Sequence, residues 1–216
     1  MEPETRKGNP LLRVLEAIAD IAIVGILWAL CSLPVITLGA ATVGAYRAGG
    51  VLSEPKHSLS REFFRAFREN FRQATAMELL LLAGGGILWL DLRILKAMKV
   101  SGVSVVLIVL AAVWYLIALV VFPLMSRYDN TLSHHLRNAA AMVLLNLPRC
   151  ALLLAFSALP VLLFALNPQM FLNFALPIVL AFWPGCYFLG SGHLMKKMFL
   201  RFERTPAAGE GKDDLS

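Results

Sequence analysis

Three residues that break or loosen a helix interrupt the first long apolar segment of the chain. They lie in the sequence LPVITLG, where Pro34 removes a backbone N–H, Thr37 carries a hydroxyl and Gly39 lacks a side chain. A proline frees a carbonyl, a threonine can bond to backbone, and a glycine lets another helix approach. Together they predict a broken helix that lines a ligand or ion site. The alternative interpretation is a structural kink that packs helices together.

An ionisable residue, Glu78, stands one turn into the second apolar segment. A carboxylate at membrane depth is costly unless it is paired or hydrated, so its presence predicts a specific partner. Arg72 and Arg149 are the natural candidates, because each directly precedes an apolar segment. The pattern favours a salt bridge that joins an amphipathic segment to a span over a proton or substrate relay.

Two asparagines, Asn70 and Asn146, occur at similar places, each a few residues before an apolar segment. Asparagine stabilises chain reversals through hydrogen bonds of its own side chain. We therefore predict that both side chains cap or bond the junctions at which a surface helix turns into the membrane. A role as ligand-binding residues is the alternative.

The motifs of known enzymes and metal sites are missing from the sequence. HExxH, GxSxG, Walker and CxxC patterns do not occur, so we expect no catalytic activity, no metal ion and no cofactor. His134 and His135 are adjacent, hence about 100° apart on a helix, whereas a metal-binding pair favours a spacing of four residues. The cysteines, Cys31, Cys150 and Cys186, lie in apolar segments and are expected to be small core residues.

The composition is typical of a membrane protein. Of the 216 residues, 58% are hydrophobic and 16% are charged, which is more apolar and less charged than soluble domains are. The formal charge is +6, and most basic residues lie between or just beyond the apolar segments, where anionic lipid headgroups would meet them. No soluble basic module remains outside these segments, so nucleic acid is not an expected partner.

Four apolar segments have the length of a single membrane span, which is roughly 20 residues. They are residues 74–90, 103–125, 149–166 and 171–189. With the first segment they predict an all-α, polytopic transmembrane bundle of five to six spans. We expect residues 17–200 to form this single domain, between an N-terminal tail of residues 1–16 and a disordered C-terminal tail of residues 201–216.

The first apolar segment, residues 17–46, is long for one crossing and short for two, with Pro34 near its middle. In one interpretation residues 17–33 cross the membrane, and residues 35–50 lie in the protein interior or at the interface. In the other, both halves cross as a tight hairpin. The sequence leaves the number of crossings open.

The segment REFFRAFRENFR, residues 61–72, has the pattern of an amphipathic helix. At about 100° per residue its phenylalanines share one face and its arginines another. We predict a helix on the membrane surface, with Ser60 as its N-cap, phenylalanines facing the acyl region and arginines binding anionic headgroups. The arginines are Arg61, Arg65, Arg68 and Arg72.

A second connector, residues 131–147, also has an apolar face, so two interfacial amphipathic helices are predicted. Each connector ends near an asparagine and leads into a span. This indicates an internal repeat that relates residues 18–90 to residues 103–166, as transporters often contain. Most Lys and Arg residues lie on the side of these helices and of the C-terminus, which predicts that this side is cytoplasmic.

Several motifs resemble those of one protein family. The sequence LWALCSLPVITLGAATVGAY, residues 27–46, resembles the opening signature of the YesL-like family of bacterial integral membrane proteins, whose function is unknown. FFRAFRENFRQAT at residues 63–75, RYDNTL at 127–132 and NLPR at 146–149 resemble further elements in the same order. The resemblance covers nearly the whole chain and implies a multi-pass protein of the bacterial inner membrane, often encoded beside sugar uptake and carbohydrate-utilisation systems.

Three functions are compatible with these observations. The resemblance implies an accessory or regulatory protein of oligosaccharide uptake, whose partner is a sugar transporter or membrane sensor and whose docking surface is the Phe/Arg segment with RYDNTL. The broken first segment and the repeat favour a small transporter or channel in its own right. The basic segments favour a structural protein that binds lipids.

Overall fold

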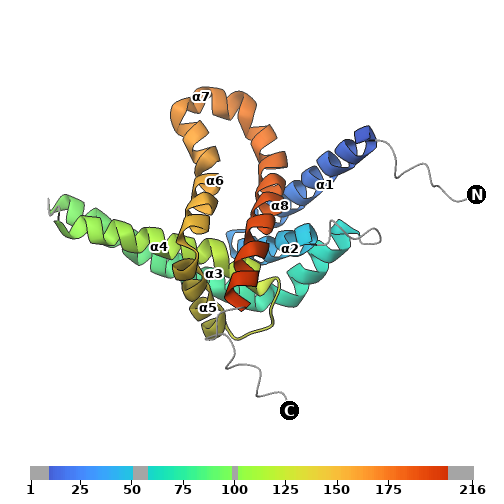
Figure 1. Cartoon of the computed structure of the whole chain (residues 1–216). Coiled ribbons are helices and arrows are strands. Elements are labelled where there is room, and N and C mark those ends of the chain that lie inside the picture. The colour runs from blue at the N-terminus through green and yellow to red at the C-terminus, as the bar shows by residue number, and fades with distance from the viewer. Residues whose placement is uncertain (1–9, 51–57, 99–101, 204–216) are drawn as a thin grey trace, which may run out of the picture.

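The computed structural model describes residues 10–50, 58–98 and 102–203, and every regular element in these ranges is a helix, as predicted (Figure 1). The elements are α1 (Pro10–Cys31), the 3-10 turn η2 (Val35–Thr37), α2 (Leu38–Gly50), α3 (Leu59–Ala97), α4 (Gly102–Met125), α5 (Leu132–Leu145), α6 (Leu147–Leu166), α7 (Pro168–Met170), the π-helical η3 (Phe171–Ala175) and α8 (Leu176–Glu203). Helix α1 begins inside the predicted N-terminal tail, and α8 extends three residues into the predicted C-terminal tail, the rest of which lies outside the described residues.

Two helical hairpins extend in different directions from a shared centre (Figure 1). One consists of α3 and α4, and the other of α6 and α8 with α7 at its tip. Helix α2 packs against α1, α3, α4 and α8. Two apolar clusters fill the centre, one mainly from α2, α3, α4, α5 and α8, the other from α1, α2, the start of α3 and the middle of α8.

Within the described residues, three helices are long and apolar enough to cross a membrane, namely Val14–Cys31, Gly102–Met125 and Leu147–Leu166. Helix α8 contributes a shorter apolar stretch, Leu176–Gly192. These helices expose many apolar side chains, among them Val105 and Val161, as helices that span a membrane do. The chain thus has the features of a membrane protein, but the predicted five to six spans are not confirmed.

The interruption predicted at Pro34 is present. Helix α1 ends at Cys31, Pro34 has extended backbone, and α2 starts at Leu38 after a single 3-10 turn. Helix α2 has 13 residues and rises about 20 Å, less than the roughly 30 Å of the hydrocarbon core. Most of its residues are buried against other helices, so this half of the first apolar segment lies in the protein interior.

The Phe/Arg segment is not a separate surface helix, because it forms the first turns of α3, a single helix of 39 residues. Its N-cap is Ser58 and not the predicted Ser60, and no side-chain bond caps it. The prediction for one residue of the phenylalanine face was wrong: Phe63 is fully buried and packs on Gly44 of α2 rather than on acyl chains, whereas Phe64 is 40% exposed. Helix α2 covers Phe63 where lipid was expected to cover it.

The arginine face of α3 does point away from the protein. Arg61, Arg65, Arg68 and Arg72 are all exposed. Arg65 also forms ion pairs with Glu62 and Glu69, both with N to O distances of 3.3 Å. Such exposed pairs contribute little to stability.

The two connectors differ in structure although their sequences look alike. The second one forms α5, which ends at Leu145, and Asn146 separates it from α6. The first has no such break, because α3 runs through Asn70 without interruption. Helix α2 also has no counterpart between α4 and α5, so the features that suggested a repeat are not matched at these junctions.

His135 lies on the buried face of α5. Its side chain is 1% exposed, and its Nε2 has no hydrogen-bond partner. Burial lowers the pKa of His135 below its ordinary value, while the charge of Asp129 opposes this and His134 adds to it. The folded protein therefore holds this imidazole in its neutral form more strongly than the unfolded chain does.

We expect the protein to lose stability as the pH falls from about 7.5 to about 5.5. As the pH falls through the ordinary pKa of histidine, His135 binds a proton in the unfolded chain before it does so in the folded protein. The contribution of His135 to stability is therefore complete above the pKa of the unfolded chain and declines below it. Thermal unfolding in detergent at several pH values measures this slope. His135→Leu should flatten it, whereas His134→Leu, which changes the exposed neighbour, should keep it. Equal slopes in all three proteins would contradict this prediction.

Candidate functional site

Glu78 holds the start of α2 to α3. Its Oε2 accepts a hydrogen bond of 2.8 Å from the backbone N–H of Gly39, one of the first N–H groups of α2, which have no partner within the helix. The positive end of the helix dipole adds a favourable interaction with a carboxylate. Glu78 is 3% exposed, so this buried contact fixes α2 against α3.

The salt bridge predicted for Glu78 is not formed. Neither Arg72 nor Arg149 pairs with it, and its Oε1 has no hydrogen-bond partner. Arg72 is on the exposed face of α3, and the Arg149 Nη1 donates instead to Asn146 Oδ1 at 2.9 Å. A backbone N–H that the Pro34 break exposes takes the place of the predicted arginine.

The residues around the break form hydrogen bonds and close contacts with one another. The Thr37 hydroxyl lies 2.6 Å from the Cys31 carbonyl and 2.7 Å from that of Pro34, which accounts for carbonyls that the proline leaves free. A Cβ at Gly39 would lie 2.7 Å from the Ala74 carbonyl oxygen, so only glycine allows this approach of α2 to α3. Pro34, Thr37, Gly39 and Glu78 thus form one structural unit.

The two asparagines have different roles. Asn146 is buried at the break between α5 and α6, where its Nδ2 donates to the Met142 carbonyl at 3.2 Å and its Oδ1 accepts from Arg149. It therefore bonds a junction, as predicted. Asn70 lies inside α3, where its Nδ2 donates to the Ala66 carbonyl at 3.0 Å, so it bonds within a continuous helix and caps no break in it.

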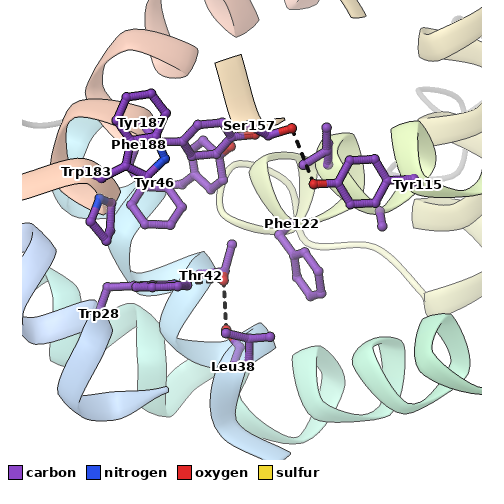
Figure 2. A pocket seen from close by; sticks show the side chains of 13 residues that line it. Trp28, Leu38, Thr42, Tyr46, Tyr115, Phe122, Ser157, Trp183, Tyr187 and Phe188 are labelled. Carbon is purple, nitrogen blue, oxygen red and sulfur yellow. Dashed lines mark hydrogen bonds between the residues drawn. The ribbon is translucent and has the colours of Figure 1, made fainter. Parts of the chain in front are cut away.

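A pocket of about 340 Å³ lies where α1, α2, α4, α6 and α8 meet (Figure 2). Rings from four of these helices form most of its lining: Trp28, Tyr46, Tyr115, Phe122, Trp183, Tyr187 and Phe188. Figure 2 shows Trp28, Tyr46 and Trp183 on one side of the pocket and Tyr115 on the opposite side. An apolar cavity with a few convergent polar groups is the usual form of a small-molecule site.

The polar groups of the pocket are hydroxyls, and most already have partners. Thr42 accepts from Trp28 Nε1 at 3.1 Å and donates to the Leu38 carbonyl at 2.8 Å. The Tyr115 hydroxyl lies 3.3 Å from Ser157 Oγ, joining α4 to α6 across the pocket. The hydroxyl of Tyr187 is buried without a hydrogen bond of ordinary geometry.

The pocket adjoins the predicted site without including it. Leu38 and Phe122 line the pocket, and a Cβ on Gly39 would lie 2.9 Å from the Phe122 ring. The sequence analysis did not predict the aromatic lining. Leu38, Thr42 and Tyr46 recur every fourth residue, and this spacing shows that they share one helix face, but only the packing of five helices shows that the face borders a cavity.

No group of three or more His, Cys, Asp or Glu side chains in the described ranges could hold a metal ion. Cys31, Cys150 and Cys186 are free thiols, and Cys150 is fully buried in the main apolar cluster. The groups that could act chemically here are therefore the Glu78 carboxylate and the hydroxyls of the pocket.

Residues 21–92 match the sequence profile of a family described as "Protein of unknown function, DUF624". This range holds the second half of α1, all of α2 and most of α3, so it includes the Pro34 break, the Gly39–Glu78 bond and the Phe/Arg segment. The match covers a third of the chain. Neither the curated proteins nor the solved structures contain a match to the sequence.

Proposed function

We propose that this chain is a non-catalytic accessory protein of the bacterial inner membrane, of the YesL-like type, that binds a partner in oligosaccharide uptake. The profile matched by residues 21–92 agrees with the resemblance of the motifs at residues 27–46 and 63–75. The carbohydrate link is part of the proposal and comes from the resemblance alone. In this proposal the ends of α5 and α8 and the start of α3 face the cytoplasm.

The observation that carries the proposal is a polar face on which the RYDNTL loop, residues 127–132, is fixed from three sides. Arg47 of α2 donates to the Ser126 carbonyl at 2.8 Å. Gln73 of α3 donates to the Asn130 carbonyl. The Arg127 guanidinium lies 4.7 Å from the centre of the Phe199 ring of α8. The Gln73 contact joins the loop to α3 just after the Phe/Arg segment, and the Arg47 contact holds the residue just before the loop.

The loop is held in place while its polar side chains remain exposed. Arg127, Asp129 and Asn130 are all exposed. A surface that is ordered before binding loses less conformational entropy when a partner docks. A preformed, charged surface of this kind supports docking to another protein better than it supports a role confined to lipid binding.

Transport by the chain itself has less support. Glu78 is buried and bonded to the Gly39 backbone, and neither Glu78 nor Pro34 lines the pocket. A hydrated path that reaches these residues would favour transport. The lining of mostly carbon atoms favours a packed, accessory role.

Arg127→Ala should lower recovery of the transporter partner about tenfold or more in affinity purification from mild detergent. Arg93→Ala is a matched control, because Arg93 is also exposed and also lies over a ring, 5.0 Å from the centre of Trp89, but at the far end of α3. Recovery with Arg93→Ala should equal that of the unchanged protein.

Two outcomes would contradict the accessory proposal. One is repeated purification of the protein without any transporter or sensor subunit. The other is uptake of an oligosaccharide into vesicles that contain this protein alone, at a rate above that of empty vesicles.

A further inference from the structure

The aromatic pocket has no charged side chain in its lining. A bound phosphate, carboxylate or ammonium group would therefore lie in an apolar site without a counter-charge, at a high desolvation cost. This property excludes charged ligands from the interior of the pocket. It leaves neutral molecules, of which sugars and hydrocarbon chains are the two relevant classes.

Thr42 and Ser157 already bond within the protein, and the Tyr187 hydroxyl is the buried lining hydroxyl that lacks a partner, so the pocket offers few hydrogen bonds to a sugar. Thr42 both accepts and donates within the protein, and Ser157 donates to the Leu154 carbonyl besides its contact with Tyr115. Each sugar hydroxyl buried without a partner would cost roughly 1–3 kcal/mol. A ligand with many hydroxyls thus fits this lining poorly, whereas a hydrocarbon chain needs no partners.

The size and position of the pocket also favour a hydrocarbon chain as its ligand. A volume of about 340 Å³ is near the lower end of the range for ligand sites, which suits one chain better than a whole two-chain lipid. Three of its five helices, α1, α4 and α6, are the ones long and apolar enough to span a membrane. A pocket between such helices is within reach of lipid.

We propose that this pocket binds one hydrocarbon chain of a membrane lipid. The chain lies between Trp28 and Trp183 on one side and the Tyr115–Ser157 pair on the opposite side (Figure 2). The site does not depend on the proposed accessory function, because it rests on the lining alone.

The test uses the full-length protein in vesicles with a diacylglycerol that carries a photoreactive diazirine in one acyl chain. Peptide mapping should find saturable labelling on the lining segments of α4 and α8. Ala118→Phe, which places a ring in the pocket, should reduce this labelling about tenfold. Ala112→Phe, on an exposed position of the same helix, should leave it unchanged. Ser157→Leu, which fills the pocket from α6, should act like Ala118→Phe and serves if that variant does not fold.

Two results would overturn the proposal. Labelling of outward-facing residues only, equally in all variants, would show that no lipid chain enters. Displacement of the probe by maltotriose would identify a sugar site. Co-purification of a transporter affects none of these readouts, so the two proposals fail independently.

Discussion

Gly185→Ala is expected to destabilise the protein by about 2–3 kcal/mol and to lower its midpoint of thermal unfolding by about 5–10 °C. Gly185 of α8 crosses Gly25 of α1, and each glycine lies against the backbone of the other helix. A Cβ at Gly185 would lie 2.0 Å from the Ile21 carbonyl oxygen, and one at Gly25 would lie 2.1 Å from that of Ala181. Because backbone atoms cannot rotate away, the helices would have to separate.

Gly192→Ala is the control for this prediction. It lies on the same helix, and a Cβ there would meet nothing within 4 Å, so the variant should unfold at the same or a slightly higher temperature, since alanine favours helix by up to about 1 kcal/mol. The double variant Gly25→Ala with Gly185→Ala should lose less stability than the two single variants lose in sum, because one separation of α1 from α8 relieves both clashes. Equal unfolding midpoints for Gly185→Ala and Gly192→Ala would contradict the crossing.

The helices themselves could be predicted from the sequence with useful accuracy. The predicted segments 103–125 and 149–166 correspond to α4 (Gly102–Met125) and α6 (Leu147–Leu166). This succeeds because a long apolar run is a local property with few alternative structures. The same argument explains the break at Pro34, since proline blocks a helix whatever surrounds it.

The orientation of Phe63 could not be predicted in the same way. Helical periodicity shows that an apolar face exists, but it does not show what covers that face. Lipid was the expected cover, and α2 is the actual one, because Gly44 leaves room for the Phe63 ring. The contact between these residues depends on how α2 folds back after the Pro34 break, which no local pattern specifies.

The partner of Glu78 was missed for a related reason. Sequence reasoning searched for opposite side-chain charges and therefore proposed Arg72 and Arg149. The actual donor is the backbone N–H of Gly39, 39 positions away, which becomes available only because α2 begins there. The crossing of Gly25 with Gly185 was also invisible, because several glycines in the apolar segments have no distinguishing neighbour in sequence.

Glu78→Leu should destabilise the protein by about 2–3 kcal/mol, because it leaves the Gly39 N–H buried without an acceptor. The midpoint of thermal unfolding should fall by about 5–10 °C. Glu78→Gln keeps an oxygen at the same distance from the backbone and should lose less than half as much. Leu79→Ala, which shortens an exposed neighbour, should change the midpoint little. Similar midpoints for Glu78→Leu and Leu79→Ala would show that the bond does not stabilise α2.

The same variants distinguish a structural carboxylate from a proton relay. Glutamine can accept the Gly39 hydrogen bond, but it cannot release a proton at neutral pH. If Glu78 only fixes α2, Glu78→Gln should keep partner recovery in affinity purification near that of the unchanged protein, while Glu78→Leu reduces recovery together with stability. If the protein instead couples proton movement to uptake, Glu78→Gln should remain folded and lose that uptake in vesicles. The position of Glu78 outside the pocket lining and its bond to α2 lead us to expect the first result.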